Sequence, residues 1–216
     1  MNALSIEDFK TKMKDEDIFI LDTRPAVEFT QGFIPGSISI GLEGRFAEWA
    51  GSLLPFDKPM ILVTPEGKED QTIVRLARVG FDKIEGYLKG GFDAWKQMGE
   101  KIDMIVDVAP DELAIDIPHD PNLVVLDVRK KAEYINGHIQ EAIHIPLSEM
   151  VDPGSMAVIE DDMNLYIHCA GGYRSVIAAS LLKRQGFHNL RNVTGGWNII
   201  KDTEGIKLAK EESVLN

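Results

Sequence analysis

The chain has 216 residues, of which 44% are hydrophobic, and its formal net charge at pH 7 is −12. An acidic surface repels phosphate backbones and anionic lipids, so the composition disfavours nucleic-acid and membrane partners. No stretch approaches the roughly 18 consecutive apolar residues of a membrane-spanning helix, and the N-terminal stretch MNALSIEDFKTKMKDED lacks the basic and apolar regions of a secretion signal.

Short apolar runs alternate with helical patterns along the whole chain. In the first half, apolar runs at 18–22, 59–63 and 83–88 predict buried strands, and the segments at 71–80 and 90–99 predict helices. The second half predicts strands at 123–127, 165–168 and 189–193, and helices at 129–136, 175–186 and 195–202, the first of them capped by Gly137. This alternation predicts an α/β fold with parallel sheets.

The two halves are copies of one unit. FILDTRPAVEFTQGFIPGSISI, from Phe19, aligns without a gap on VVLDVRKKAEYINGHIQEAIHI, from Val124, and GG at 90–91 falls on GG at 195–196. We therefore expect two domains, 1–104 and 105–216, joined near 101–110. Residues that recur in both copies are interpreted as scaffold, among them Asp127, Arg129 and Glu133, and the last two are four apart and suited to pairing along a helix.

The only cysteine of the chain, Cys169, lies in the stretch HCAGGYRS, directly after an apolar run and just before a helical one. Gly171 and Gly172 allow a tight turn, in which successive N–H groups point inward and form an anion-binding nest. Arg174 adds a full positive charge, and Ser175 is placed to cap the following helix. This combination favours a thiolate, which is the nucleophilic form of cysteine.

A lone cysteine is also compatible with an inert buried residue, and its neighbours carry similar alternatives. His168 is predicted to be a packed core residue, Tyr173 to line a pocket mouth or to be an exposed loop tip, and Trp95 and Trp197 to pack helices on sheets. A single cysteine cannot form an intrachain disulfide, which fits a reducing cytoplasm. No His, Cys and carboxylate cluster has metal-ligand spacing, so we expect neither a metal nor another cofactor.

The first copy lacks this chemistry. Thr64 occupies the cysteine position, and the stretch that follows, PEGKEDQ, is expected to reach its helix one residue sooner than in the second copy. Its acidic residues repel an anion, and Lys68 is the only candidate for a remnant of the arginine. The first copy is therefore predicted to be catalytically inactive, with a structural or interfacial role.

Three motifs of the second copy, LDVRKKAEYINGHIQEAIHIP, CAGGYRS and GGW, resemble a rhodanese domain over residues 105–200, and the first copy resembles an inactive one. The resemblance implies two tandem rhodanese-like domains, each a parallel sheet flanked by helices on both faces. It implies that Cys169 carries a sulfane sulfur as a persulfide. By the same resemblance, the backbone of the loop cradles this sulfur and Arg174 helps to hold an anionic donor. The substrate-binding set is then Ala170, Gly171, Gly172, Tyr173, Arg174 and Ser175.

The expected function is a sulfurtransferase that passes a sulfane sulfur from thiosulfate or a low-molecular-weight persulfide to a thiol or to cyanide. Related dual-specificity phosphatases have five residues between Cys and Arg, whereas four residues separate Cys169 from Arg174. This shorter spacing makes a phosphatase the less favoured hypothesis. The inactive–active pairing also resembles the C-terminal part of persulfide dioxygenase fusions. An upstream metallo-β-lactamase-fold domain is thus a possible partner, and a sulfur-binding or regulatory module without turnover is the alternative function.

Overall fold

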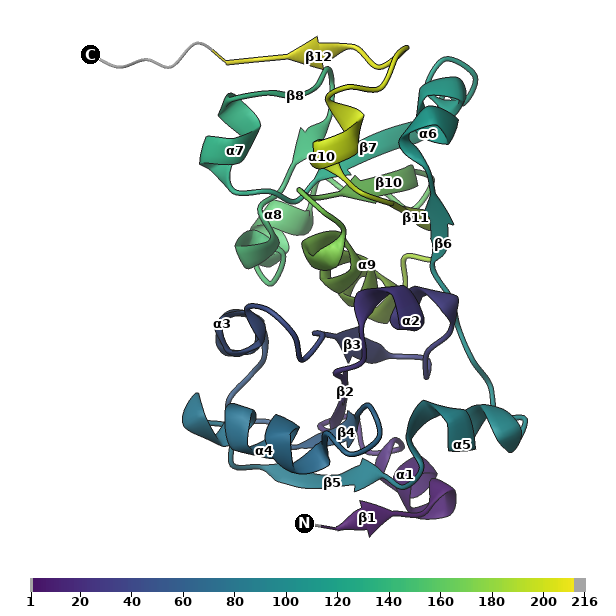
Figure 1. Cartoon of the computed structure of the whole chain (residues 1–216), viewed down its shortest axis with the longest axis vertical. Helices are drawn as coiled ribbons and strands as arrows, with labels where there is room; N and C mark the ends of the chain where they lie inside the picture. The colour runs from purple at the N-terminus through teal and green to yellow at the C-terminus, as the bar shows by residue number, and fades with distance from the viewer. Residues whose placement is uncertain (1, 212–216) are drawn as a thin grey trace. The chain divides into compact units, whose positions relative to one another are not determined.

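The computed structural model describes residues 2–211 and divides into two compact units, with the boundary between Met104 and Ile105 (Figure 1). Each unit is described by itself. Both are α/β units built on a five-stranded, all-parallel sheet, which confirms the predicted fold class. None of the helices in this part of the chain combines the length and the hydropathy that crossing a bilayer requires.

The sheet of the first unit has the strand order β1-β5-β4-β2-β3. Its elements are β1 (Ala3–Leu4), α1 (Ile6–Lys12), β2 (Phe19–Asp22), α2 (Ala26–Gln31), β3 (Ser37–Ser39), α3 (Phe46–Leu53), β4 (Met60–Val63), α4 (Glu69–Arg78), β5 (Ile84–Leu88) and α5 (Gly91–Gln97). β2 and β4 are buried at every position. Continuous apolar runs form such strands because a parallel sheet is covered on both faces.

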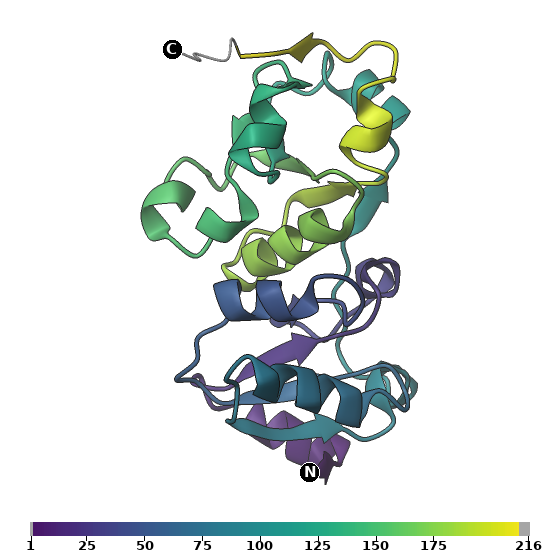
Figure 2. The ribbon, with the colours of Figure 1, turned by 60° about the vertical axis from the view of Figure 1, so that its left-hand side comes forward.

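Two sets of helices cover the two faces of this sheet. On one face, Phe9 from α1 and Phe92 and Trp95 from α5 join a cluster with Ile61 and Val63 of β4. Helices α3 and α4 contact one another and lie on the other side of the sheet in both ribbon views (Figures 1 and 2). The helical pattern at 71–80 is confirmed as α4, whose buried residues include Leu76.

The sheet of the second unit has the order β6-β11-β10-β7-β9, the same arrangement with β6 in the place of β1. Its elements are β6 (Val106–Val108), α6 (Pro110–Asp116), β7 (Leu123–Asp127), α7 (Lys131–Ile135), β8 (His138–Ile139), β9 (Ile143–His144), the 3-10 helix η1 (Leu147–Glu149), α8 (Pro153–Met156), β10 (Asn164–His168), α9 (Tyr173–Arg184), β11 (Leu190–Val193), α10 (Trp197–Ile200) and β12 (Leu208–Ala209). β12 pairs with β8 in a separate antiparallel ribbon.

The second sheet is likewise covered on both faces. Leu113 of α6 and Ile200 of α10 pack with Val125 and Tyr166 in one cluster. α9 lies on the opposite face against β10 and β11, with η1 beside it (Figure 2). Eight consecutive residues of α9, from 175 to 182, are buried, which fixes this helix firmly under the strand that precedes it.

The observed helices begin and end one or two residues from the predicted positions, and the shifts of α7 and α9 bear on the site. The helix predicted at 129–136 is shorter, because α7 runs only from Lys131 to Ile135 and its C-cap is Asn136 rather than Gly137. The helix predicted from residue 175 begins earlier, at Tyr173, with Gly172 as its N-cap. The early start brings residues 173–175 into the first turn of α9, next to the cysteine.

Candidate active site

Cys169 directly follows β10, a central strand with β7 on one side and β11 on the other. Loops at the carboxyl ends of parallel strands are the usual place for ligands in such sheets. The cysteine is free and only 1% exposed, and three residues separate it from the first residue of α9. The prediction that the cysteine lies between a strand end and a helix start is confirmed.

The sulfur atom of Cys169 is held by the beginning of α9. The Gly172 N–H donates to Sγ at 3.1 Å, and Sγ lies 3.6 Å from Oγ of Ser175. Gly172 has a φ of 106°, a left-handed conformation that turns its amide toward the sulfur and that a side chain would disfavour. Ser175 is not the helix cap predicted from the sequence, because it is the third helical residue and its hydroxyl donates to the Gly172 carbonyl at 3.2 Å.

The GGW motif fixes the backbone of the cysteine loop. The Trp197 N–H donates to the Cys169 carbonyl at 2.7 Å, and the Asn198 N–H donates to the Ala170 carbonyl at 3.0 Å. Gly196 approaches so closely that a Cβ there would lie 2.3 Å from the Cys169 carbonyl oxygen. The glycine therefore lets the start of α10 reach the loop.

Arg174 forms a two-pronged ion pair with Glu133 of α7. Its Nη1 and Nη2 donate to the two carboxylate oxygens at 2.7 and 2.8 Å. The hydrogen bonds from Arg174 lower the pKa of Glu133 to about 2, and those to Glu133 raise the pKa of Arg174, so both groups are charged at neutral pH. The interpretation of Glu133 as scaffold did not include this contact with the predicted anion-binding arginine.

The predicted pairing of Arg129 with Glu133 is wrong. The buried Arg129 binds both carboxylate oxygens of Asp127, at 2.6–3.0 Å, donates to the Gly137 carbonyl at 2.7 Å and stacks on the Trp197 ring at 4.3 Å. It thereby connects the end of β7 to the turn that holds the cysteine loop.

The first unit contains the same arrangement at the equivalent positions. Arg24 binds both carboxylate oxygens of Asp22 and the carbonyl of Gly32, and it stacks on Phe92 at 4.0 Å. The counterpart of Trp197 is thus Phe92 and not Trp95, which packs in the core and donates its indole N–H to the Lys101 carbonyl. This cluster recurs in a copy without the cysteine, so it belongs to the scaffold.

His168, at the end of β10, is completely buried, as the sequence predicted for a core residue. Its Nδ1 lies 3.2 Å from the Cys169 carbonyl, and its Nε2 lies 3.5 Å from Oδ2 of Asp127 without forming a hydrogen bond. Burial lowers the pKa of His168, although the Asp127 carboxylate acts in the opposite direction. The imidazole is therefore neutral at pH 7 and stands between the Asp127–Arg129 pair and the cysteine loop.

The corresponding loop of the first unit is built differently. Thr64 follows β4 and is 3% exposed, and α4 begins only at Glu69, with Lys68 as its N-cap. Four residues separate Thr64 from this helix, one more than in the second unit, so the prediction of a shorter approach was wrong. The first turn of α4 carries Glu69 and Asp70 where α9 carries Arg174 and Ser175.

Comparison with known proteins agrees with these two units. The family described as Rhodanese-like domain matches residues 5–98 and again residues 109–203. The chain belongs to the rhodanese-like family. The resemblance inferred from the three motifs is thereby confirmed for both domains.

Among curated relatives, a putative sulfur carrier protein of Bacillus subtilis, YrkF, is 35% identical over 108 residues, covering 50% of this chain and 55% of the relative. A tRNA uridine(34) hydroxylase of Pectobacterium atrosepticum is 36% identical over 81 residues, which are 36% of this chain and 23% of that protein. The chain thus spans about half or less of the length of these relatives. A solved thiosulfate sulfurtransferase from Pseudomonas aeruginosa aligns with 98% of this chain and 44% of its own, at 20% identity and a TM-score of 0.43.

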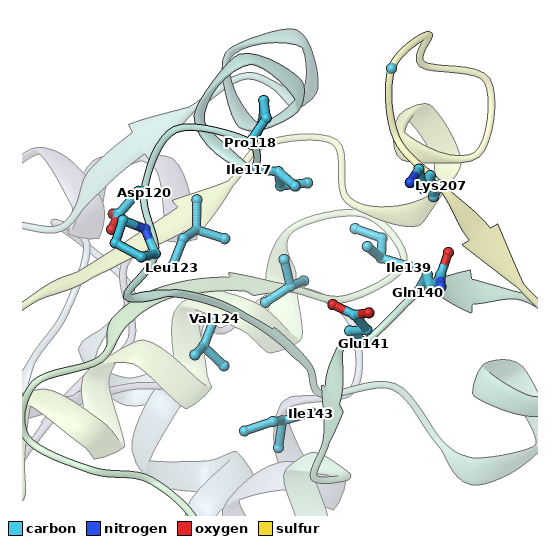
Figure 3. A pocket seen from close by; sticks show the side chains of 13 residues that line it. Ile117, Pro118, Asp120, Leu123, Val124, Ile139, Gln140, Glu141, Ile143 and Lys207 are labelled. Atoms are coloured by element: carbon cyan, nitrogen blue, oxygen red, sulfur yellow. The ribbon is translucent and has the colours of Figure 1, made fainter.

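A separate hollow of about 640 Å³ lies in the second rhodanese-like domain, away from the cysteine loop (Figure 3). Its lining includes Leu123, Val124 and Val125, the first three residues of β7, whereas the cysteine follows the last residue of β10. Since the two strands are parallel, the hollow and the loop lie toward opposite ends of the sheet. The lining of the hollow includes no cysteine, serine, threonine or histidine, and the residues described by the structure include no group of three or more potential metal ligands.

Sequence reasoning located the cysteine loop of the second rhodanese-like domain but missed two of its supports. Glu133 was interpreted as scaffold because a glutamate, Glu28, recurs at the same place in the first domain. Glu133 and Glu28 differ in the residue available to pair with them, since the position of Arg174 is occupied by Glu69 in the first copy. In the sequence, only the recurrence of the Gly pair in both copies pointed to the GGW motif, and nothing indicated that it anchors the carbonyls of the cysteine loop.

Proposed function

We propose that the second rhodanese-like domain is a sulfurtransferase in which Cys169 carries the transferred sulfur as a persulfide. The observation that carries the proposal is the loop geometry, with the Gly172 N–H 3.1 Å from Sγ at the start of the twelve-residue helix α9. An N–H donor and the positive end of a helix stabilise negative charge on sulfur in the thiolate and in the persulfide alike. The rhodanese-like family of the chain supports sulfur transfer in general.

The reaction takes place in two displacement steps. In the first, the Cys169 thiolate attacks the outer sulfur of a donor, the S–S bond of the donor breaks, and sulfite leaves from thiosulfate or a thiolate from a persulfide. In the second, the acceptor attacks the outer sulfur of the Cys169 persulfide, and the cysteine leaves as a thiolate. Because the chain has one cysteine, it cannot release the sulfur by forming an internal disulfide, so a thiol or cyanide must accept it.

The loop residues divide the work in this mechanism. Gly172 donates its N–H to the sulfur, and Ser175 places a hydroxyl beside it. Ala170 presents its carbonyl to Asn198, which holds the turn, and Arg174 lies in the first turn of α9 with its guanidinium paired to Glu133. Gly171 is exposed and Tyr173 is half-buried, so both line the approach to the buried sulfur.

We propose in addition that the first rhodanese-like domain carries no sulfur. Thr64 has no thiol, and Glu69 and Asp70 place negative charge at the start of α4, where a persulfide needs positive charge. Its retained Asp22–Arg24 cluster maintains the fold, so a structural role fits this domain.

The test compares Cys169→Ser with a Thr64→Ser control. After incubation with a donor and removal of the excess, intact mass spectrometry of the wild type and of the control is expected to show one added sulfur atom. Cys169→Ser is expected to show none and to lose cyanide-dependent turnover. Full transfer activity in Cys169→Ser would refute the proposal.

A second candidate is a sulfur carrier without turnover, which the name of the Bacillus subtilis relative favours. Such a carrier accepts one equivalent of sulfur at Cys169 and releases it only to a specific partner, for which an upstream metallo-β-lactamase-fold domain is one candidate. Steady-state thiocyanate formation well beyond one equivalent per chain supports the enzyme, whereas a single stoichiometric burst supports the carrier. Hydrolysis of an aryl phosphate would instead support the phosphatase alternative.

A further inference from the structure

Arg174 is the charged side chain of the predicted anion-binding set, yet its charge is already balanced. Both terminal nitrogens of its guanidinium are bound by the carboxylate of Glu133, at 2.7 and 2.8 Å. The pair is half-buried, with 15% of the arginine side chain and 34% of the glutamate side chain exposed. A planar two-pronged contact of this kind fixes the orientation of both groups.

Glu133 is itself held in place by the backbone of its own helix. Its Oε2 accepts the Lys130 N–H at 3.0 Å, so the glutamate satisfies the backbone donor of the N-cap residue of α7. The residue that precedes Lys130 is the buried Arg129, so this turn is connected to the core through the Asp127 ion pair. The carboxylate is therefore anchored independently of Arg174, and it offers the guanidinium a fixed partner.

The charge available to a donor follows from this geometry. The Arg174–Glu133 pair contributes no net charge, and the nearby Arg129 is neutralised by Asp127. What remains for an anion at Sγ is the Gly172 N–H, the Ser175 hydroxyl and the partial charge at the start of α9. These groups suit one negative charge on sulfur, whereas a dianion needs an unpaired cation as well.

We infer that Glu133 is a specificity-determining residue that makes the Cys169 loop select a thiol persulfide over thiosulfate as its sulfur donor. The inference rests on the proposed sulfurtransferase function. A Cys169 thiolate and a protonated persulfide, RSSH, carry one negative charge between them, and the products are Cys169–SSH and RS⁻. A Cys169 thiolate and thiosulfate carry three, and the products are Cys169–SS⁻ and sulfite. The second reaction brings two more negative charges to a loop whose Arg174 is already neutralised by Glu133.

The experiment measures kcat/KM for thiosulfate and for glutathione persulfide with cyanide as the common acceptor. Glu133→Gln removes the charge and keeps an amide oxygen that can accept from Arg174. The ratio of thiosulfate to persulfide kcat/KM is expected to rise about tenfold, as removal of one partly buried like charge predicts. Glu28→Gln changes the equivalent, exposed glutamate of the first domain, and it is expected to leave the ratio within about twofold of the wild-type value.

A ratio that is unchanged or lower in Glu133→Gln overturns the inference, as does an equal change in Glu28→Gln. A structural role alone would depress both donors together and leave the ratio unmoved, so the ratio distinguishes specificity from folding. Mass spectrometry of Cys169 after donor treatment separates this outcome from failure of the proposed function. If wild-type Cys169 gains sulfur while the ratio stays constant, only the inference fails, and if Cys169 gains no sulfur from either donor, both fail.

Discussion

The close approach of Gly196 to the cysteine loop makes Gly196→Ala a sensitive perturbation of the candidate site. A Cβ at this position would lie 2.3 Å from the Cys169 carbonyl oxygen and 3.0 Å from two backbone atoms of Ala170. These atoms belong to the main chain and cannot rotate away as a side chain can. The backbone of Gly196 also has a φ of 52°, which a residue with a side chain rarely adopts.

The magnitude follows from two contributions. Placing an alanine in the backbone conformation of Gly196, with φ of 52° and ψ of −147°, costs about 1–3 kcal/mol, and losing the two anchoring hydrogen bonds from Trp197 and Asn198 costs about 0.5–1.5 kcal/mol each. We therefore expect Gly196→Ala to lower the free energy of unfolding by about 2–6 kcal/mol. The displaced loop is expected to lower the rate of sulfur transfer by about 10- to 100-fold, because the sulfur leaves its position opposite Gly172.

Gly91→Ala is the matched control, since Gly91 occupies the equivalent place in the first domain. There the added Cβ would lie 3.1 Å from the Thr64 carbonyl oxygen, at a φ of 58°. Denaturant unfolding and cyanide-dependent turnover of both variants provide the assay, and Gly91→Ala is expected to lose stability without losing transfer. The reasoning is refuted if Gly196→Ala retains wild-type stability and turnover, or if Gly91→Ala slows transfer equally.

Three further predictions concern the buried polar residues. Because burial lowers the pKa of His168, unfolding releases a histidine that binds a proton more readily, so stability declines as pH falls below the unfolded value of about 6.5. His168→Val introduces the residue found at this place in the first domain. The free energy of unfolding of this variant should depend less on pH between about pH 6.5 and 5. An unchanged pH dependence, measured by urea unfolding at several pH values, would contradict this. Arg129→Met leaves Asp127 buried without its partner and should lower the free energy of unfolding by about 3–5 kcal/mol in chemical denaturation, with loss of sulfur transfer. Arg24→Met should destabilise the first domain and leave sulfur transfer intact. Equal effects of the two variants on sulfur transfer would contradict this prediction. Ser175→Ala removes the hydroxyl 3.6 Å from Sγ and should lower kcat about twofold to tenfold, with the free energy of unfolding nearly unchanged. Stopped-flow measurement of sulfur loading checks this prediction, and a wild-type rate would refute it.

The sequence alone determined the main features of the fold. The apolar runs at 123–127 and 165–168 predicted β7 and β10 because a strand buried on both faces needs apolar residues at nearly every position. The internal alignment predicted two equivalent domains, since identical residues at a constant separation require equivalent surroundings. The sequence also predicted the position of Cys169 between a strand and a helix, because both elements are adjacent to it in the chain.

The supports of the site required the tertiary structure. Glu133 and Arg174 are 41 residues apart, and they meet only because α7 and the start of α9 converge on the same end of the sheet. The register that pairs His168 with Asp127 places an imidazole beside the buried ion pair, and the turn before α10 brings Trp197 and Asn198 to the loop carbonyls. Local propensity and periodicity decide which residues form each strand and helix. The sequence therefore identified the cysteine, while the packing of separate elements decided what surrounds it and which charges it meets.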